Sequence, residues 1–385
     1  ERSLYGACDT RYNPTKLHFG RNVLNDLGKS AMKYGSKAIL IYGKGSIKSN
    51  GIYDEIIKQL NSYNIEFIEH SGIKSNPLVD DVDIAVEKAR EFGAEMVIAV
   101  GGGSVVDSGK GIALTVPSSK HTWDFYSRKE KPQKALPLLA VLTLAATGTE
   151  MNPVSVLQNH ETNQKIGFAH PLMYPAHSFL DPQNTISVNR EYTAYGIADL
   201  TAHSLEAWFG SGEASLSDRI VISIIQEAMD FGPALLSHLE SYDLRARIMY
   251  AATLALNGLT NNGRISGDWG VHALGHEMSL LFDVPHGASL TIAYPAWLKF
   301  HKELLNERII TLGENLFRSG NADETIHKME EFFQNLGAPV RLRDIDLHSD
   351  DKQSKLLDSM NKNKAQGIHH KLSDDDRAKI VDLMV

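Results

Sequence analysis

Short apolar runs alternate with helix-like patterns along the first half of the chain, and this alternation constrains the fold more than any other feature. Four runs have the length and composition of buried strands, at 37–42, 66–70, 96–100 and 136–144. Between them, apolar residues recur at helical spacing in 52–60 and 79–89. Parallel strands joined by crossover helices produce this order. The sequence therefore predicts an α/β domain built on a doubly wound parallel sheet.

The second half of the chain differs, with long helical patterns and few strand-like runs beyond Asp181 and Pro182. Helical patterns cover 192–209, 215–231, 244–259 and 304–317. The polar stretch 348–370 is typical of an irregular connection, and Ser373 with the acidic residues after it is suited to begin a last helix. We predict two domains, an α/β domain at 1–182 and an all-α domain at 183–385.

Composition narrows the functions open to this chain of 385 residues. Acidic residues outnumber basic ones, 47 against 39, and the net charge of −8 disfavours nucleic acid and anionic membranes as partners. No stretch reaches the roughly 18 apolar residues of a membrane span. The single cysteine, Cys8, excludes a metal site built from several thiolates. With one cysteine and no apolar signal core, we expect a cytoplasmic protein in which histidine and carboxylate groups would hold any metal.

Two glycine-rich loops each follow a predicted strand and precede a helix. They are GKGS at 43–46 and GGGS at 101–104. Small residues at such a turn let backbone N–H groups approach a phosphate at the start of the helix. Neither loop is a G-x-G-x-x-G fingerprint, because Lys48 and Val106 occupy the third glycine positions, and neither is a P-loop. Tight-turn geometry alone is the alternative, but two such loops in one sheet favour a phosphate-binding, Rossmann-like domain.

The predicted helical domain contains histidine and carboxylate residues at metal-ligand spacing. Asp199 and His203 are four residues apart and would share one face of a helix. His272 and His276 have the same spacing, and His286 follows a proline. Three histidines and an aspartate suit a divalent metal that keeps room for a substrate oxygen. Such spacings also arise by chance among sixteen histidines. Spacing alone does not choose the ligands, because three further carboxylates compete: Glu206, Asp268 and Glu277.

The combination of these motifs is more specific than any one of them. The segments GGGSVVDSGKGIA at 101–113 and TLAATGTEMN at 143–152, the D-x3-H at 199–203, and H-x3-H at 272–276 followed by His286 together resemble the iron-containing, group III alcohol dehydrogenases. The resemblance spans nearly the whole chain, including SNP at 75–77 and FLDP at 179–182. It is strongest to the branch of NADPH-dependent butanol dehydrogenases and aldehyde reductases, which share segments like YGKGSIKSNG and GVHALGHEMS.

This resemblance implies a site for a divalent metal, Fe²⁺ by the family name with Zn²⁺ as the alternative. By matching positions, the expected metal ligands are Asp199, His203, His272 and His286. His276 matches a further histidine near the nicotinamide and the substrate, and it could relay a proton. Three other residues could line an apolar substrate pocket, although their types are equally typical of a helix core: Trp269, Phe282 and Leu259.

The resemblance also implies a nicotinamide cofactor bound by the glycine-rich loops. It assigns the pyrophosphate to the GGGS loop, and it places Asp107 near the nicotinamide amide with Thr143 and Thr147 along the cofactor cleft. A helix cap is the alternative role for Asp107, and a capping box of Thr147 with Glu150 is the alternative for TGTE. The expected cofactor-binding residues are Gly43, Lys44, Gly45, Ser46, Asn76, Gly102, Gly103, Ser104, Asp107, Thr143, Thr147 and Lys165.

Lys44 determines which nicotinamide cofactor we expect. NAD-preferring members of the resembled family tend to have an acidic residue just after the first strand, and Lys44 occupies that position here. An ammonium and the Ser46 hydroxyl would attract the 2′-phosphate that a carboxylate repels. Lys165 matches a lysine that this branch brings near the same phosphate. We therefore predict NADP(H) over NAD(H), with a solvated loop lysine as the alternative for Lys44.

Together these expectations describe a metal-dependent NADP(H) alcohol dehydrogenase or aldehyde reductase. Its expected substrates are small primary alcohols and aldehydes such as butanol and butanal, and the resemblance implies a homodimer. One alternative is a glycerol dehydrogenase-like polyol dehydrogenase of the same fold, which His203 and the loop at 43–46 disfavour. The other is a non-catalytic binding protein that retains the fold, and the complete ligand set argues against it.

Overall fold

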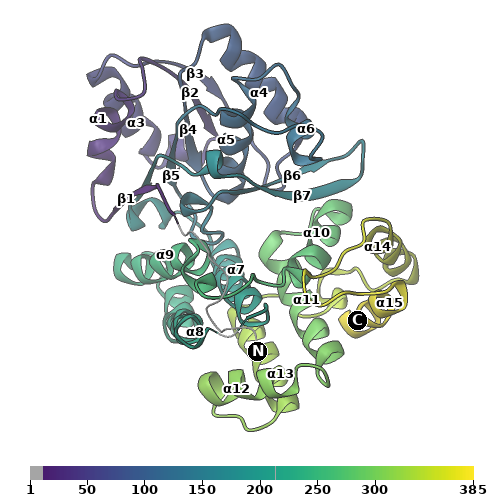
Figure 1. Ribbon diagram of the computed structural model, residues 1–385. Helices are drawn as coiled ribbons and strands as arrows, with labels where there is room; N and C mark the ends of the chain where they lie inside the picture. Colours follow the sequence, from purple (N-terminus) through teal and green to yellow (C-terminus); the bar gives the residue numbers. More distant parts are fainter. Residues whose placement is uncertain (1–11, 213) are drawn as a thin grey trace. The chain divides into compact units, whose positions relative to one another are not determined.

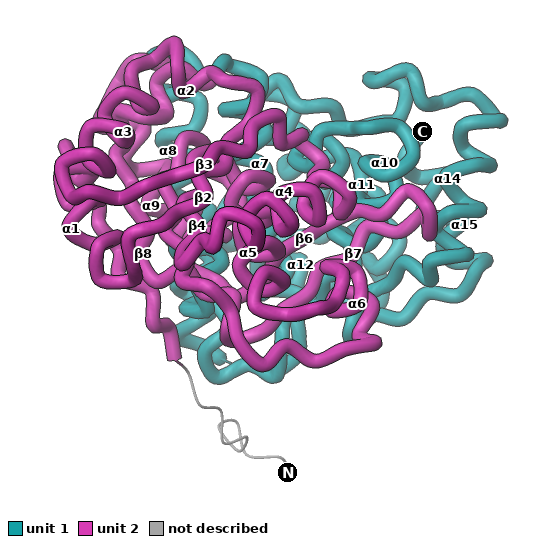
Figure 2. The backbone as a smooth tube through the Cα atoms, turned by 90° about the horizontal axis from the view of Figure 1, so that it is seen from above, with its two compact units in different colours: residues 1–11, 189–238, 254–385 teal, residues 12–188, 239–253 magenta. Residues whose placement is uncertain are grey.

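The computed structural model describes residues 12–212 and 214–385, so that Cys8 lies outside the described residues. The chain divides into two compact units, which we call the sheet unit and the helical unit (Figure 2). The sheet unit comprises residues 12–188 and 239–253, and the helical unit comprises residues 189–238 and 254–385. The sheet unit thus continues past residue 182 and also takes in part of the predicted helical domain.

The sheet unit contains a six-stranded sheet in which all neighbouring strands are parallel (Figure 1). The strand order is β1-β8-β5-β4-β2-β3. The strands are β1 (Lys16–Phe19), β2 (Lys37–Tyr42), β3 (Glu66–His70), β4 (Met96–Gly101), β5 (Leu138–Leu142) and β8 (His177–Leu180). Between β5 and β8, the chain forms an antiparallel hairpin of β6 (Val154–Asn159) and β7 (Gln164–Ala169). The predicted α/β class with a parallel sheet is confirmed.

Helices cover both faces of this sheet, which explains why its central strands are continuously apolar. The helices are α1 (Leu27–Ala31), α2 (Ser46–Ser49), α3 (Ile52–Ser62), α4 (Val79–Phe92), α5 (Gly103–Thr115) and α6 (Thr122–Tyr126). On one face, Ile39 of β2 belongs to the same core cluster as Val82 of α4. On the other face, Leu40 of β2 clusters with Ile56 of α3. Successive strand residues therefore fill two separate cores.

Three strand regions were not predicted from the sequence. β1 and β8 have only four residues each, and a histidine in each strand interrupts the apolar pattern. The hairpin β6–β7 mixes polar and apolar residues, because only part of it is buried. Short or half-polar strands give little periodic signal.

The helical unit is formed mainly by long helices (Figure 1). Its elements are α7 (Arg190–Trp208), α8 (Ser215–Ser237), α10 (Gly270–Phe282), α11 (His286–His301), α12 (Asn306–Phe317), α13 (Ala322–Leu336), α14 (Asp350–Lys362) and α15 (Asp374–Met384). The predicted all-helical character of this half is confirmed. The expectation of an irregular connection over 348–370 is wrong, because α14 lies within it. Only Leu356, Ser359 and Met360 of α14 are buried, too narrow a stripe to stand out in a polar sequence.

Helix α9 (Tyr242–Leu256) belongs largely to the sheet unit although it follows α8 in the chain. Met249 clusters with Leu142 and Leu180, which end β5 and β8. Thr253 Oγ1 donates to Glu150 Oε1 at 2.5 Å. Since the Glu150 side chain is directed to Thr253, it does not form the capping box that the TGTE sequence suggested.

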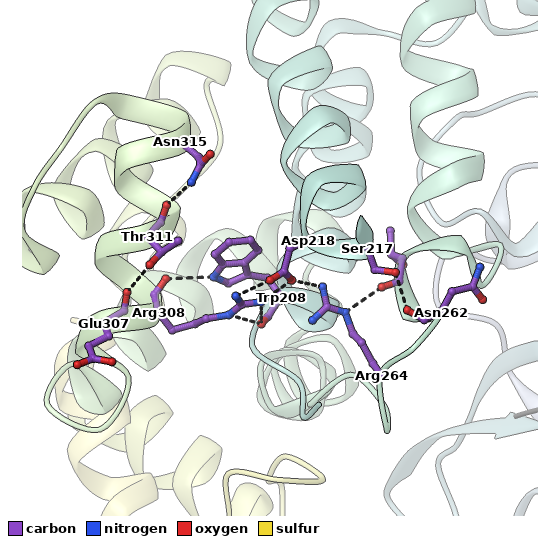
Figure 3. A network of polar contacts seen from close by, with 10 residues as sticks. Trp208, Ser217, Asp218, Asn262, Arg264, Glu307, Arg308, Thr311 and Asn315 are labelled. Carbon is purple, nitrogen blue, oxygen red and sulfur yellow. Dashed lines mark hydrogen bonds and ion pairs between the residues drawn. The ribbon is translucent and has the colours of Figure 1, made fainter. Parts of the chain in front are cut away.

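A polar network joins parts of the helical unit that are distant in sequence (Figure 3). Asp218, in the first turn of α8, accepts hydrogen bonds from Nη1 and Nη2 of Arg308 at 2.7 and 2.6 Å, and it also pairs with Arg264. The Arg308 guanidinium carbon lies 3.6 Å from the centre of the Trp208 ring. The network thereby links the end of α7 with the starts of α8 and α12.

Candidate active site

Among the residues that the structure describes, one group of side chains could hold a metal ion, and it consists of the four expected ligands Asp199, His203, His272 and His286. One donor atom from each lies within 4.8 Å of the others. Asp199 and His203 lie one turn apart on α7, His272 lies in the first turn of α10, and His286 begins α11. Oδ1 of Asp199 is 3.6 Å from Nε2 of His203, 3.9 Å from Nε2 of His272 and 3.6 Å from Nε2 of His286.

These donors fit one divalent transition metal. Metal–ligand bonds of about 2.1 Å allow two ligand atoms to lie up to about 4.2 Å apart. All three distances from Asp199 Oδ1 to histidine nitrogens are shorter than this limit, and all four donor atoms lie within 4.8 Å of one another, so that they would move slightly closer together around an ion. Burial, and to a lesser extent the neighbouring His272, lowers the pKa of His203 well below its ordinary value. The His203 ring is therefore neutral, as a metal ligand must be.

The three competing carboxylates lie outside the set of donors; Asp268 and Glu277 bond to other residues, and Glu206 contacts the far nitrogen of one donor residue, His272. Glu206 accepts a hydrogen bond from the backbone N–H of Trp269 at 2.5 Å, and its Oε1 lies 2.9 Å from Nδ1 of His272. Burial raises the pKa of Glu206 to about 8, and the backbone N–H of His272 opposes this shift. Asp268 accepts two backbone N–H groups of the loop before α15. Glu277 accepts hydrogen bonds from two side chains at the end of α14.

Two aromatic side chains border the four donors. The ring of His276 is 5.5 Å from that of His286 and 6.4 Å from that of His272, measured between centroids. The Trp269 ring is 5.2 Å from the His272 ring and 6.1 Å from the His203 ring. Both side chains are half-buried. An imidazole and an indole therefore adjoin the ligand group without belonging to it.

The two glycine-rich loops lie at the same edge of the sheet. GKGS follows β2 and GGGS follows β4, and these strands are parallel neighbours. The order of strands reverses here, since β3 lies beyond β2 on one side and β5 lies beyond β4 on the other. Open α/β sheets bind ligands outside the carboxyl ends of the strands at such a reversal. Thr143 and Thr147, which follow β5, extend this edge.

Close packing accounts for two glycines of the GGGS loop. A Cβ atom on Gly103 would lie 2.6 Å from Cγ2 of Thr147, and one on Gly102 would lie 3.2 Å from Cβ of Leu144. The backbone N–H of Thr143 also donates to the carbonyl of Gly101 at 2.9 Å. The loop after β5 therefore packs directly on the GGGS loop, which requires small residues there whether or not a phosphate binds.

Three of the expected cofactor residues come together from different elements. Lys165 on β7 donates to Oδ1 of Asn76 at 2.8 Å. Ser104 donates through Oγ to the carbonyl of Ser75, the residue before Asn76. Asn76 is buried and follows β3. The start of α5, the loop after β3 and the hairpin thus form one polar cluster.

Asp107 bonds to two neighbouring elements and does not cap its own helix. Its carboxylate oxygens accept hydrogen bonds from Thr149 Oγ1 at 2.6 Å and from the Val156 N–H at 2.9 Å. Burial raises the pKa of Asp107, and the charge of Lys110 opposes this shift. Lys110 is fully buried, and its Nζ donates to Thr149 Oγ1 at 2.6 Å. Burial lowers the pKa of Lys110 to about 8. Asp107 and Lys110 together anchor the loop before β6.

A polar cluster beside the GKGS loop was not predicted from the sequence. Glu69, on β3, accepts hydrogen bonds from the hydroxyls of Tyr42 at 2.5 Å and Tyr53 at 2.6 Å. Nζ of Lys48 is 3.4 Å from Glu69 Oε2 and 4.5 Å from the centre of the Tyr53 ring. The sequence offered only one indication of this cluster, the acidic residue Glu69 near the end of the predicted strand 66–70. Its bonding partners became apparent only in the fold.

Comparisons with known proteins identify the family. The model for the iron-containing alcohol dehydrogenase family matches residues 14–182, and the model for the C-terminal part of the Fe-containing alcohol dehydrogenase family matches residues 193–384. The chain therefore belongs to the iron-containing alcohol dehydrogenase family, and it is an oxidoreductase of the alcohol dehydrogenase class. The resemblance predicted from the sequence motifs is confirmed.

Individual relatives differ in the cofactor that their names give. Probable NADH-dependent butanol dehydrogenase 2 of Bacillus subtilis is 40% identical over 347 residues, which cover 88% of this chain and 89% of that protein. The NADPH-dependent aldehyde reductase YqhD of Escherichia coli is 32% identical, with 87% and 88% covered. The crystal structure of NADH-dependent butanol dehydrogenase A from Thermotoga maritima has 34% identity and a TM-score of 0.94, with 98% of each chain covered.

Proposed function

We propose that this chain is a divalent-metal-dependent alcohol dehydrogenase and aldehyde reductase that uses NADP(H) and acts on small primary substrates such as butanol and butanal. The observation that carries the proposal is the convergence of one carboxylate and three imidazoles on a single point. A bound ion would supply Lewis acidity to the substrate oxygen, and a nicotinamide would take up or supply the hydride. We propose Fe²⁺ from the family, with Zn²⁺ as the alternative because it binds such donors more tightly.

Two residues of this chain have proposed roles beside the ligands. His276, whose ring lies 5.5 Å from that of His286, would carry the proton to or from the substrate oxygen, because imidazole titrates near neutral pH. Trp269 packs on two of the ligand rings and offers an apolar surface for the alkyl chain of the substrate. The positions of both rings next to the donors support these roles.

The preference for NADP(H) is supported by charges near the GKGS loop. Lys44 and Ser46 are exposed in the loop after β2, and neither introduces a negative charge that would repel a 2′-phosphate. Glu69 is already bonded to two tyrosines and paired with Lys48, which weakens it as an acceptor for ribose hydroxyls. Lys165 bonds to Asn76, and its proposed contact with the 2′-phosphate rests on the family resemblance.

A spectrophotometric screen tests this function. The protein, loaded with Fe²⁺ or Zn²⁺ and assayed for metal content, is mixed with NADPH or NADH and with aldehydes from acetaldehyde to hexanal. We expect metal-dependent NADPH oxidation that is fastest with medium-chain aldehydes. Flat traces with metal present would refute the enzymatic proposal. An NADH efficiency equal to or above that of NADPH would refute the cofactor preference alone.

We also propose that the chain is a cytoplasmic homodimer without nucleic-acid or membrane partners. Helix α8 is long and apolar enough to cross a membrane by length and composition, but this is weak evidence. Val221 and Ile225 on α8 are buried within the protein, as in a core helix. Size-exclusion chromatography with light scattering should give the mass of two chains, and a monomer mass at assay concentrations would contradict the dimer.

A further inference from the structure

Glu206 lies directly beside the ligand group on α7. It is seven residues after Asp199 and three after His203, so that all three side chains share one face of the helix. Glu206 is almost fully buried, with 1% of its surface exposed. Oε1 accepts the backbone N–H of His272 at 3.0 Å and lies 2.9 Å from Nδ1 of the same residue. Oε2 accepts a hydrogen bond from the backbone N–H of Trp269 at 2.5 Å.

These contacts select the nitrogen of His272 that faces the other donors. Nε2 of His272 faces the other donors and Nδ1 faces Oε1 of Glu206, so a ring that binds a metal through Nε2 keeps its proton on Nδ1, where Oε1 accepts it. The lone pair then resides on Nε2, which lies 3.9 Å from Oδ1 of Asp199. Because one carboxylate oxygen contacts both the backbone and the ring of His272, rotation of the ring would break the Nδ1 contact.

We propose that Glu206 is a positioning residue that orients His272 for metal binding. This inference rests on the proposed function, since it requires that the four donors bind a metal. A carboxylate that accepts the remaining N–H of a metal-bound imidazole fixes the ring and raises its basicity, and loss of such a partner commonly weakens metal binding by about 10- to 100-fold.

A purely structural role for Glu206 makes a different prediction. Trp269 precedes α10 with a left-handed backbone, φ 65°, and Glu206 accepts its N–H as well as that of His272 in the first turn. If Glu206 only stabilised this turn, its replacement would lower the stability of the metal-free protein. It would leave the metal affinity of the folded protein unchanged. Metal affinity and metal-free stability must therefore be measured separately.

The test compares E206Q with the wild-type chain. An amide replaces one carboxylate oxygen by an N–H donor, so that glutamine cannot accept at both positions. The measurements are the Zn²⁺ dissociation constant against a competing chelator, the visible spectrum of the Co²⁺-loaded protein, and the thermal unfolding of the metal-free protein. We expect about 10- to 100-fold weaker Zn²⁺ binding and an altered Co²⁺ spectrum, at a temperature where the variant is folded.

E277Q serves as the matched control. Glu277 is also buried, at 4% exposure, and lies on α10 near the ligands, but it accepts hydrogen bonds from Ser359 at 2.5 Å and Asn363 at 2.9 Å. We expect wild-type Zn²⁺ affinity and an unchanged Co²⁺ spectrum for E277Q. If both variants lose affinity equally, the effect is general loosening of the helical unit and the inference is wrong.

The remaining outcomes separate this inference from the proposed function. If the wild-type chain does not bind Zn²⁺ or Co²⁺, the metal site fails and the positioning role fails with it. If the wild type binds and E206Q binds equally well with the same spectrum, only the positioning role is overturned. Should E206Q not fold, E206D retains a carboxylate that is shorter by one methylene. We expect weaker binding from E206D, and wild-type affinity would overturn the inference.

Discussion

Neighbouring residues of the same type have different surroundings in this protein. His272 and His276 are one turn apart on α10, yet Nε2 of His272 faces Asp199 at 3.9 Å while His276 lies outside the group of four donors. Glu206 contacts the other side of the His272 ring. Identical residue types with identical helical spacing can therefore have different chemistry, and substitution distinguishes them.

Replacement of His276 by alanine should reduce turnover without removing the metal. Loss of a proton-transferring group commonly lowers the rate by about 100-fold or more, whereas the four donors remain in place. Turnover and metal content would be measured on the same preparation, with H272A as the variant expected to lose metal. If H276A also loses its metal, His276 is a ligand and its assigned role is wrong.

Replacement of Lys44 by glutamate should shift the cofactor preference toward NADH. A lost charge-assisted hydrogen bond of about 1.5–3 kcal/mol corresponds to roughly tenfold or more in the ratio of kcat/KM for NADPH over NADH. K33E is a suitable control, because Lys33 is exposed and precedes β2, at the opposite end of that strand from Lys44. An unchanged ratio in K44E would show that Lys44 is only a solvated loop lysine.

Helices and loops assemble the sites from separate parts of the chain. α7 alone supplies two of the candidate metal donors and Glu206, because residues at spacings of four and three lie on one helical face. α10 and α11 supply the remaining donors. In the sheet unit, the strand order brings loops from β2 and β4 to one edge. Contacts between elements therefore matter as much as the elements themselves.

Replacement of Asp218 by alanine should destabilise the helical unit. Arg264 is buried, with 1% of its side chain exposed, and would lose its charge partner. Arg308 would lose a two-point hydrogen bond. Since Asp218 is partly exposed, we expect a loss of about 2–4 kcal/mol in the free energy of unfolding, less than for a fully buried pair. Urea denaturation followed by circular dichroism measures this loss.

D323A is the control for that measurement. Asp323 forms an ion pair with Lys302 at 2.9 Å, but its side chain is 78% exposed. Solvent screening makes such a pair contribute little to stability, so we expect a much smaller loss in D323A than in D218A. Equal losses in D218A and D323A would mean that the network around Asp218 adds no more than a surface ion pair.

The stability of the whole molecule should depend on pH through buried histidines. Burial, and to a lesser extent the charge of His18, lowers the pKa of His177 to about 4. His18 Nε2 and His177 Nδ1 are 2.9 Å apart, and their rings stack. Between pH 6.5 and about pH 4, His177 is protonated in the unfolded chain but remains neutral in the folded chain. The stabilising contribution is therefore complete above pH 6.5 and is lost as the pH falls toward 4.

We expect the melting temperature of the metal-free protein to fall between pH 7.5 and pH 5. In H177F, where the titrating ring is replaced by an apolar ring of similar size, this fall should be smaller. Thermal unfolding at both pH values, for both proteins, measures the difference. An identical pH dependence in H177F would show that His177 does not contribute. Metal-free protein is used so that release of the metal at low pH does not add to the change, and the comparison of the two proteins cancels the titration of the other histidines.

Strong local periodicity made most elements predictable, and weak periodicity explains the failures. The runs at 37–42 and 66–70 correspond to β2 and β3 without any change in their bounds. β1 and β8 are too short to show a pattern, and α14 buries too few residues to stand out. Similarly, the set of candidate ligands could be narrowed by spacing and family resemblance, but the bonding of Glu206 could not be deduced from spacing.

Sequence by itself determined the class of this protein. The spacing of apolar residues predicted an α/β part and a helical part, and the motifs identified the family. Only the tertiary structure showed that Glu206 contacts the far side of the His272 ring, since that depends on how the chain places α7 beside the start of α10. It also revealed that the Glu69 carboxylate accepts hydrogen bonds from tyrosine hydroxyls on β2 and α3. The physical reason is that periodicity is a local property, whereas hydrogen-bond partners are set by contacts between residues distant in the chain.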